Sequence, residues 1–232
     1  MGQTESKAQS GERGFFVTFE GIDGCGKSTQ LRRLADRLAR MGVGLTLTRD
    51  PGGTRIGDKV RGILLDTESE GMDARAEMAL YFASRAQLVR EVIEPALGAG
   101  KVVLCDRFLD SNIAYQAYGR GIPVGEVTSA NAAIVGGPNP DLTFLIDVDP
   151  DKVGGRKRAK DRMEREPAGF HRRVCEGFRE LARAWPERIK AIDGGRDEEA
   201  VSADVAQAFH EAWDRAKGEA APLARTCEGG HP

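Results

Sequence analysis

The sequence predicts a three-layer α/β fold: a five-stranded parallel β-sheet flanked by helices on both faces, with a small helical lid. Short apolar runs of strand length alternate along the chain with longer stretches whose apolar residues recur at helical spacing. Strands that alternate with helices form parallel sheets that are buried on both faces. The chain has 232 residues, of which 40% are hydrophobic and 30% charged, and this composition suits a globular protein with a sizeable core.

Five apolar runs predict the strands. The first run, FFVTFEG at 15–21, ends in glycine, as expected of a buried strand that leads into a turn. The other four runs are VGLTLT at 43–48, KVVLCD at 101–106, DLTFLID at 141–147 and RIKAID at 188–193. These runs are spaced widely enough for a helix to cross between successive strands.

Between these runs the apolar period becomes that of a helix. From Lys27 to Met41 apolar residues recur on one face, arginines occupy the other, and Gly42 ends the helix. We expect further helices at 58–65 and 73–98, the second kinked near Pro95. A last amphipathic helix is predicted from the recurrence of Val201, Val205, Phe209 and Trp213.

The domain organisation predicted is one folded domain at 14–217 between a disordered tail at 1–13 and a flexible tail at 218–232. No apolar run approaches the roughly 18 residues that span a bilayer, and the start lacks the apolar core of a secretory signal. The net charge of −2 gives no reason to expect a nucleic-acid partner. The four cysteines lack metal-type or paired spacing, which favours reduced thiols in a cytoplasmic protein.

One stretch predicts a phosphate site. GIDGCGKST at 21–29 reads Gly-x-x-x-x-Gly-Lys-Ser and joins a predicted strand to a predicted helix, which is the context of a P-loop. Its glycines let successive N–H groups face one anion, and the helix N-terminus adds partial positive charge. Lys27 should reach the β- and γ-phosphates, and the Ser28 hydroxyl should ligate Mg²⁺. The expected contacts to ATP are Gly21, Ile22, Asp23, Gly24, Cys25, Gly26, Lys27, Ser28 and Thr29.

Asp23 is an unusual residue to find inside such a loop. Phosphate charges repel a carboxylate unless a cation or a sugar hydroxyl offsets them. Asp23 is therefore expected to face Mg²⁺, its water shell or the acceptor nucleotide, and the plain alternative is a solvated loop residue.

Three further stretches lie at or beyond predicted strand ends, where open parallel sheets bind ligands. They are TRDPGGT at 48–54, YFASRAQLV at 81–89 and CDRFLDSNIAYQ at 105–116. A monophosphate acceptor needs a fixed cation, an aromatic platform for its base and amide-like side chains that read the base. Arg107 would be the cation, Tyr81 the aromatic platform, and RDPGGT would contact the substrate through Arg49. Each has a purely structural alternative: an ion pair for Arg107, a core position for Tyr81 and a simple turn for RDPGGT.

These stretches, together with FEGIDGCGKSTQ and PDLTFLIDVDP, occur in an order and spacing that resemble the thymidylate kinase family over roughly residues 14–215. The resemblance implies a nucleoside monophosphate kinase domain of the P-loop NTPase fold. It also implies transfer of the γ-phosphoryl group of ATP to dTMP, with Mg²⁺, in dTTP biosynthesis, and a homodimer. Two other readings stay open: a kinase for a different nucleotide, and a nucleotide-binding switch, which would need no second pocket.

The resemblance also assigns roles to single residues. It places Asp106 at the water shell of Mg²⁺ and Arg107 on the phosphate of dTMP. Tyr81 would stack on thymine while Arg85 bonds the base. The remaining acceptor residues it implies are Ser111 and Asn112 near thymine, Tyr115 beneath the deoxyribose, and the adjacent Gln116.

The source of catalytic positive charge is a separate question, because phosphoryl transfer leaves charge on the transferred oxygens. The P-loop has no basic residue at 22–25, but GGRKRAKDRMERE at 154–166 follows the fourth strand and is rich in arginine and lysine. We expect this stretch to belong to a lid at about 151–169, as in relatives that carry basic catalytic residues there; a solvated helix face is the other reading. The expected catalytic residues are Asp23, Lys27, Arg107, Arg156 and Lys160.

Overall fold

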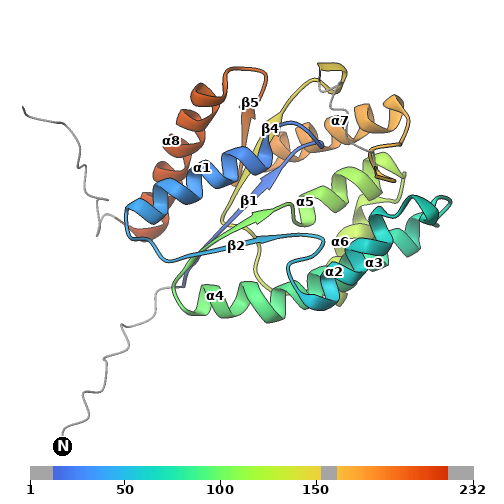
Figure 1. The fold of residues 1–232 in the computed structure, drawn as a ribbon, viewed down its shortest axis with the longest axis horizontal. Coiled ribbons are helices and arrows are strands. Elements are labelled where there is room, and N and C mark those ends of the chain that lie inside the picture. The colour runs from blue at the N-terminus through green and yellow to red at the C-terminus, as the bar shows by residue number, and fades with distance from the viewer. Residues whose placement is uncertain (1–12, 153–160, 219–232) are drawn as a thin grey trace, which may run out of the picture.

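The structure is a computed structural model and describes residues 13–152 and 161–218 (Figure 1). The described residues form a parallel sheet of five strands in the order β2-β3-β1-β4-β5. The strands are β1 (Phe15–Glu20), β2 (Leu45–Arg49), β3 (Val102–Asp106), β4 (Leu142–Asp147) and β5 (Ile189–Asp193). The predicted α/β fold with a five-stranded parallel sheet is confirmed.

The strand order places the two predicted phosphate sites next to each other. β1 lies between β3 and β4, and Phe19 of β1 is in register with Asp106 at the end of β3. The P-loop that follows β1 and the segment that follows β3 therefore leave the sheet side by side. Ligands of open parallel sheets bind outside these carboxyl ends.

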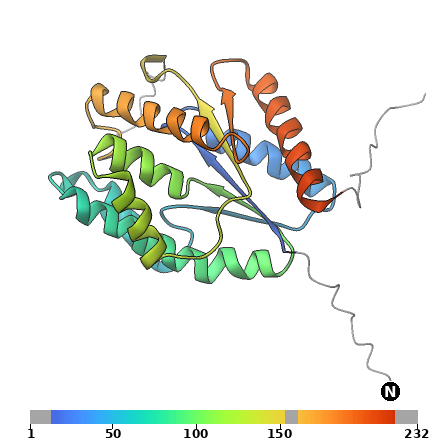
Figure 2. The same cartoon turned by 180° about the vertical axis from the view of Figure 1, so that it is seen from behind.

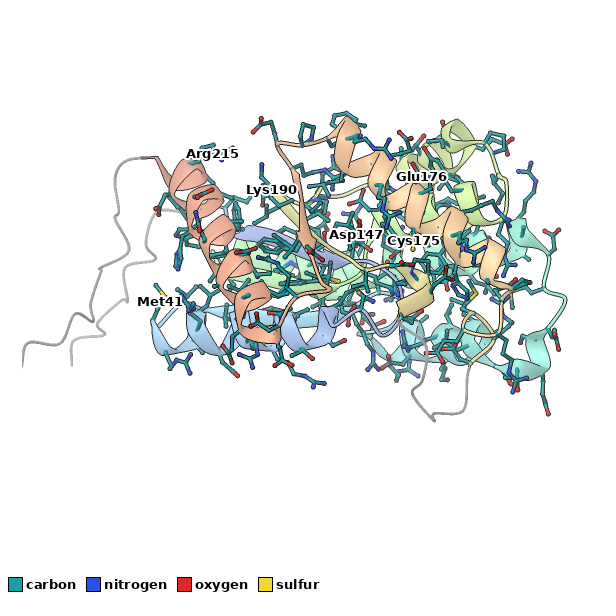
Figure 3. All side chains as sticks on the ribbon, turned by 90° about the horizontal axis from the view of Figure 1, so that it is seen from above. Met41, Asp147, Cys175, Glu176, Lys190 and Arg215 are labelled. Atoms are coloured by element: carbon teal, nitrogen blue, oxygen red, sulfur yellow. The ribbon has the colours of Figure 1, made fainter. Side chains whose placement is uncertain are left out.

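Helices cover both faces of the sheet. On one face α1 (Lys27–Arg40) packs against α8 (Glu198–Lys217), as Figure 1 shows. On the other face α7 (Ala168–Ala184) crosses β4 and β5, together with the helical segment at 109–119 (Figure 2). Figure 3 marks Asp147 at the end of β4, where it accepts a hydrogen bond of 2.9 Å from Arg179 of α7.

The core lies between these layers and is built from the strands. The rings of Phe19 and Phe144, on neighbouring strands, lie 5.2 Å apart, and both side chains are fully buried. The central strands β1, β3 and β4 are buried on both faces and read as near-continuous apolar runs, whereas the edge strands β2 and β5 are partly exposed.

Two predicted helices differ in detail from the structure. α2 (Arg55–Leu65) begins three residues before the predicted start, because the Thr54 hydroxyl caps it by accepting the N–H of Gly57 at 2.9 Å. The predicted helix at 73–98 is α3 (Ala74–Leu88), a π-helical turn (Val89–Ile93) and α4 (Glu94–Gly98). The π turn ends two residues before Pro95, which has no N–H to offer the Glu91 carbonyl in an α-helix.

Several elements were absent from the sequence prediction. They are α5 (Leu109–Asn112), a π-helical segment (Ile113–Gly119), α6 (Val124–Ile134), α7 and the 3₁₀ turns Thr67–Ser69 and Pro150–Lys152. Within the expected helical lid, residues 151–152 belong to the 3₁₀ turn, residues 161–167 form turns rather than a helix, and residues 168–169 begin α7. Arg13, expected in the N-terminal tail, pairs with Asp141 at 2.8 Å.

Candidate active site

The P-loop is fixed by the sharp exit of the chain from β1. Gly21 has φ 131°, and a Cβ at this position would lie 2.5 Å from the Ile146 carbonyl oxygen of β4. Gly26 has φ 99° and precedes Lys27, the first residue of α1. Only glycine adopts these conformations at low cost, so the loop can bring its N–H groups to the helix N-terminus.

Lys27 is buried in the structure rather than open to solvent. Its side chain is 5% exposed, and Nζ donates a hydrogen bond of 2.7 Å to the Ile22 carbonyl oxygen within the same loop. The ammonium group takes this acceptor because a buried charge needs a hydrogen-bond partner. Lys27 nevertheless lies inside the loop, where a bound phosphate would meet it.

Ser28 and Asp106 come together from α1 and the end of β3. The Ser28 hydroxyl donates a hydrogen bond of 2.7 Å to Asp106 Oδ2. Both groups offer oxygen atoms, the ligand type that Mg²⁺ prefers when it is held by one or two carboxylates and the phosphates of a substrate. The described residues hold no group of three or more metal-ligating side chains. The residues present therefore suit a magnesium ion bound mainly through a nucleotide.

A pocket with about 500 Å³ of empty space, open to solvent, lies next to the P-loop. Seven of the eight predicted acceptor residues line it, on α3 and the segment after β3: Tyr81, Arg85, Arg107, Ser111, Asn112, Tyr115 and Gln116. Asp23 of the P-loop also lines it. The pocket thus joins the predicted donor site to the predicted acceptor site.

Arg107 occupies the boundary between the two sites. Its guanidinium donates to Asp23 Oδ1 at 2.8 Å, to the Ser111 hydroxyl at 3.1 Å and to the Tyr115 hydroxyl at 3.3 Å. Burial alone would lower the pKa of Arg107, but the charge of Asp23 and other nearby groups raises it above its ordinary value. A permanent cation therefore faces the pocket, in the place that an acceptor phosphate would need.

Asp23 faces the acceptor pocket, one of the three orientations that the sequence left open. Burial raises the pKa of its carboxyl group, but Arg107 and then Lys27 outweigh burial and hold it well below its usual range. Asp23 pairs with Arg107, whereas Asp106 pairs with Ser28. The two carboxylates expected near magnesium thus have different partners in the structure.

Arg85 of α3 also lines the pocket and is almost fully buried. Its Nε donates to Asp50 Oδ2 at 2.6 Å, and its terminal nitrogens bond Asn112 and the Phe108 carbonyl oxygen. Asn112 in turn donates to Gln116 at 2.7 Å. The result is a fixed set of amide and guanidinium groups, as expected for the readout of a base edge.

Two tyrosines supply the aromatic surfaces of the pocket. Tyr81 comes from α3, and Tyr115 comes from the helical segment after β3. The Tyr115 ring packs 6.1 Å from Phe170 and 6.2 Å from Phe178, both on α7. Burial raises the pKa of Tyr115, so its hydroxyl keeps its proton next to Arg107 and Asp23.

Arg49 is the predicted acceptor residue that does not line the pocket. It is the last residue of β2 and pairs at 3.1 Å with Asp58, and both side chains are about half exposed. Arg61 of α2 lines the pocket instead, and it donates to the Pro51 carbonyl oxygen at 3.1 Å. The signal for Arg61 was its place in the helix that directly follows RDPGGT.

Further lining residues were not singled out from the sequence: Asp50, Pro51, Leu65, Asp161 and Met163. Asp161 and Met163 belong to the described end of the expected lid, where Arg162 is anchored to Glu77 of α3 at 2.7 Å. Arg156 and Lys160, the two expected catalytic residues of the lid, lie outside the described residues.

Known proteins with similar sequences and structures identify the family. A family model described as thymidylate kinase matches residues 19–205. The thymidylate kinase of Deinococcus radiodurans is 45% identical over 202 residues, which cover 86% of this chain and 98% of the relative. That of Desulfovibrio desulfuricans is 46% identical over 213 residues, which cover 88% of this chain and 98% of the relative.

A crystal structure of thymidylate kinase from Ehrlichia chaffeensis matches with a TM-score of 0.71 and 37% sequence identity. This match covers 85% of this chain and 99% of that chain. The family model spans the P-loop, the acceptor pocket and the beginning of α8, so the match includes the whole site described above. The chain belongs to the thymidylate kinase family.

Proposed function

We propose that this protein is a thymidylate kinase, which transfers the γ-phosphoryl group of ATP to dTMP and yields ADP and dTDP. The observation that carries the proposal is the pocket beside the P-loop, in which Arg107, two tyrosines and paired amide side chains lie together. A nucleotide-binding switch would need no such second pocket. The membership of the chain in the family supports the same reaction.

The donor half of the site would hold ATP through the P-loop. Lys27 would exchange the Ile22 carbonyl oxygen for phosphate oxygens, since a triphosphate offers it a charged partner. Ser28 and Asp106 would hold Mg²⁺, which supplies charge neutralisation on the transferred phosphoryl group when it is bound. Asp106 would act as an oxygen ligand of the ion or of its water shell.

The acceptor half would hold dTMP with its phosphate on Arg107 and its base toward Arg85. Tyr81 would stack on thymine, and Asn112 and Gln116 would face its polar edge. Ser111 and Tyr115 would support Arg107, and the Tyr115 ring would lie beneath the sugar. The attacking atom is an oxygen of an ionised phosphate, so the site has to align it rather than deprotonate it.

Arg156 and Lys160 are proposed to provide the charge that meets the leaving oxygen, as in family members whose catalytic cations lie in the lid. The P-loop positions 22–25 hold no basic residue, and Arg107 is already committed to the acceptor side. Cations that act at this stage stabilise the transition state more than the bound substrates.

We also propose that the protein is a homodimer that acts in the cytoplasm, where its charged nucleotide substrates are held. The described residues contain no helix that is both long and apolar enough to cross a membrane. Exposed apolar side chains on α2, Ile56 and Ile63, are compatible with an interface between copies. Light scattering at several protein concentrations measures the oligomeric state directly.

The experiment that tests the function is an acceptor panel. Purified protein is mixed with ATP and Mg²⁺ and with dTMP, dUMP, dCMP, AMP or GMP, and ADP formation is followed. The expected result is the highest kcat/KM with dTMP. If another monophosphate gives the highest kcat/KM, the protein is a kinase for that nucleotide. If ADP forms with none of the five acceptors, the protein binds nucleotides without transferring a phosphoryl group to them.

A further inference from the structure

Glu20 is a fully buried carboxylate that spans the two halves of the site. It is the last residue of β1 and directly precedes the P-loop. Its Oε1 accepts the Phe108 N–H at 2.7 Å, and its Oε2 accepts the Ser111 hydroxyl at 2.5 Å. These donors lie one and four residues after Arg107, so a single side chain holds both ends of the turn that follows Arg107.

The backbone of Arg107 needs such support. Its φ of 70° is in the left-handed region, and among the described residues no other non-glycine residue has a positive φ. A non-glycine residue keeps this conformation only where its surroundings fix it. Here the Arg107 N–H donates to the Phe19 carbonyl oxygen at 3.0 Å, and the bond from Phe108 to Glu20 fixes the peptide that follows.

A second contact passes from Glu20 to the guanidinium itself. The Ser111 hydroxyl donates its only proton to Glu20 and accepts from Nη1 of Arg107 at 3.1 Å. A hydroxyl has one donor and two acceptor positions, so Glu20 directs the Ser111 proton away from Arg107 and leaves a lone pair for the cation. The carboxylate therefore influences both the backbone and the side chain of Arg107.

A carboxyl group at this buried position contributes little to the stability of the fold. Burial, and then the nearby charge of Asp110, raise the pKa of Glu20 to about 8, although Arg107 and the bonds from Ser111 and Phe108 lower it. Asp110 is itself held by Arg188 at 2.6 Å. A carboxyl group that burial desolvates to this degree is weak support for a fold, so its contribution lies in the two donors that it fixes.

We infer that Glu20 is a positioning residue for the acceptor: it holds Phe108 N–H and Ser111 so that Arg107 keeps the orientation in which it binds the phosphate of the monophosphate substrate. This inference rests on the proposed function, because it takes Arg107 as the phosphate-binding group. Glu20 itself touches no substrate in this role and acts through Arg107.

The test compares binding of dTMP with binding of thymidine, which has the same base and sugar but no phosphate. Glu20→Gln keeps the shape of the side chain but replaces one of its two oxygens by an amide donor, so it can no longer accept from both Phe108 N–H and the Ser111 hydroxyl. It should weaken dTMP binding about 10- to 100-fold, the range for loss of hydrogen bonds around a charged group. Thymidine binding should change less than about twofold, as should the KM for ATP.

A double-mutant cycle with Arg107→Ala gives the second readout. If Glu20 acts through Arg107, then Glu20→Gln should not weaken dTMP binding further in the Arg107→Ala background. Thr18→Val is the matched control, since Thr18 is buried on the same face of β1 two residues earlier and pairs with Thr143 at 2.8 Å instead. This control should leave dTMP and thymidine binding unchanged.

Three results would overturn the inference: equal weakening of dTMP and thymidine, additive effects of Glu20→Gln and Arg107→Ala, or dTMP binding by Glu20→Gln at the parent level. If Glu20→Gln does not fold, Ser111→Ala removes one of the two contacts and must show the same selectivity for dTMP over thymidine. The proposed function fails separately, when the parent protein forms no ADP with dTMP. An active parent whose Glu20→Gln variant misses these expectations refutes the positioning role alone.

Discussion

The substitution Glu77→Gln should strongly destabilise the protein without changing its shape. Glu77 of α3 is fully buried and is the common acceptor of a cluster that includes Gln116, one of the residues lining the pocket. It accepts from Gln116 at 2.9 Å and from Arg120 at 2.9 Å, and it pairs with Arg162 at 2.7 Å. Glutamine keeps one oxygen acceptor but removes the negative charge.

The magnitude follows from what the two arginines would keep. Arg120 has a second carboxylate, Glu166 at 2.6 Å, but Arg162 is only 6% exposed and would lose its charged partner. Removing one partner of a buried ion pair costs about 3–5 kcal/mol because the other charge stays buried. For a domain of about 200 residues each kcal/mol lowers Tm by about 2–4 °C, so Tm should fall by about 6–20 °C.

Thermal unfolding followed by circular dichroism measures this fall, with Glu176→Gln as the control. Glu176, marked in Figure 3, pairs with Arg183, and both side chains are at least half exposed, so this control should barely shift Tm. If Glu77→Gln lowers Tm by no more than the control does, the cluster does not hold Arg162 in place, and the reasoning from burial is wrong.

The same cluster predicts how the difference depends on pH. Burial raises the pKa of Glu77, but the bonds from Arg120 and Gln116 outweigh it and lower the pKa below its ordinary value. A carboxyl group with a lowered folded pKa contributes its full stability above the pKa of the unfolded state and loses it as pH falls through the folded value. The Tm difference between parent and Glu77→Gln should therefore shrink in acid.

Four further predictions concern the site. Lys27→Ala should abolish turnover and leave the circular dichroism spectrum of the parent; near-normal turnover would remove Lys27 from the mechanism. Tyr115→Ala should narrow the preference for dTMP over its ribose counterpart in competition kinetics, and an unchanged kcat/KM ratio would move the sugar contact elsewhere. Arg156→Ala should lower kcat at least ~10²-fold with little change in the KM for dTMP, and adding Lys160→Ala should lower kcat further. If both single variants and the double mutant keep the kcat of the parent, the lid does not supply the catalytic charge. Glu20 has a folded-state pKa raised to about 8, so the folded protein keeps this proton to higher pH than the unfolded chain, and the contribution of Glu20 to stability falls as pH rises from about 4.5 to 8. Chemical denaturation over this pH range should therefore show a smaller fall in the free energy of unfolding for Glu20→Gln than for the parent. Equal pH slopes of the free energy of unfolding would contradict the raised pKa.

The sheet and the P-loop could be predicted because their signals are local. The central strands β1, β3 and β4 are buried on both faces and each reads as one apolar run, and a glycine such as Gly21 is required by a backbone that only glycine adopts readily. α7 was missed although Phe170, Val174, Phe178 and Leu181 recur at helical spacing. The basic stretch at 154–166 favours a lid that ends at residue 169, and this expected lid overlaps the first turn of α7.

The site could be predicted only where a residue type and its function coincide. Arg107 and Tyr115 were found from their motif, but Glu20 and Glu77 read as ordinary charged residues until the fold buries them. Arg49 and Arg61 are equally plausible in the sequence. At the end of β2 Arg49 pairs with Asp58, whereas α2 places Arg61 in the lining of the pocket. Which arginine lines the pocket is therefore set by the tertiary fold and not by residue type.

In the proposed site, the ion pair between Asp23 and Arg107 would make the binding of the two nucleotides thermodynamically coupled. Asp23 lies in the loop proposed for ATP, Arg107 is proposed to hold the phosphate of dTMP, and the two side chains lie 2.8 Å apart. A phosphate that competes for Arg107 changes the charge balance felt at Asp23, and therefore the free energy with which the triphosphate is held. If binding of one nucleotide changes the affinity for the other by some factor, binding of the second must change the affinity for the first by the same factor.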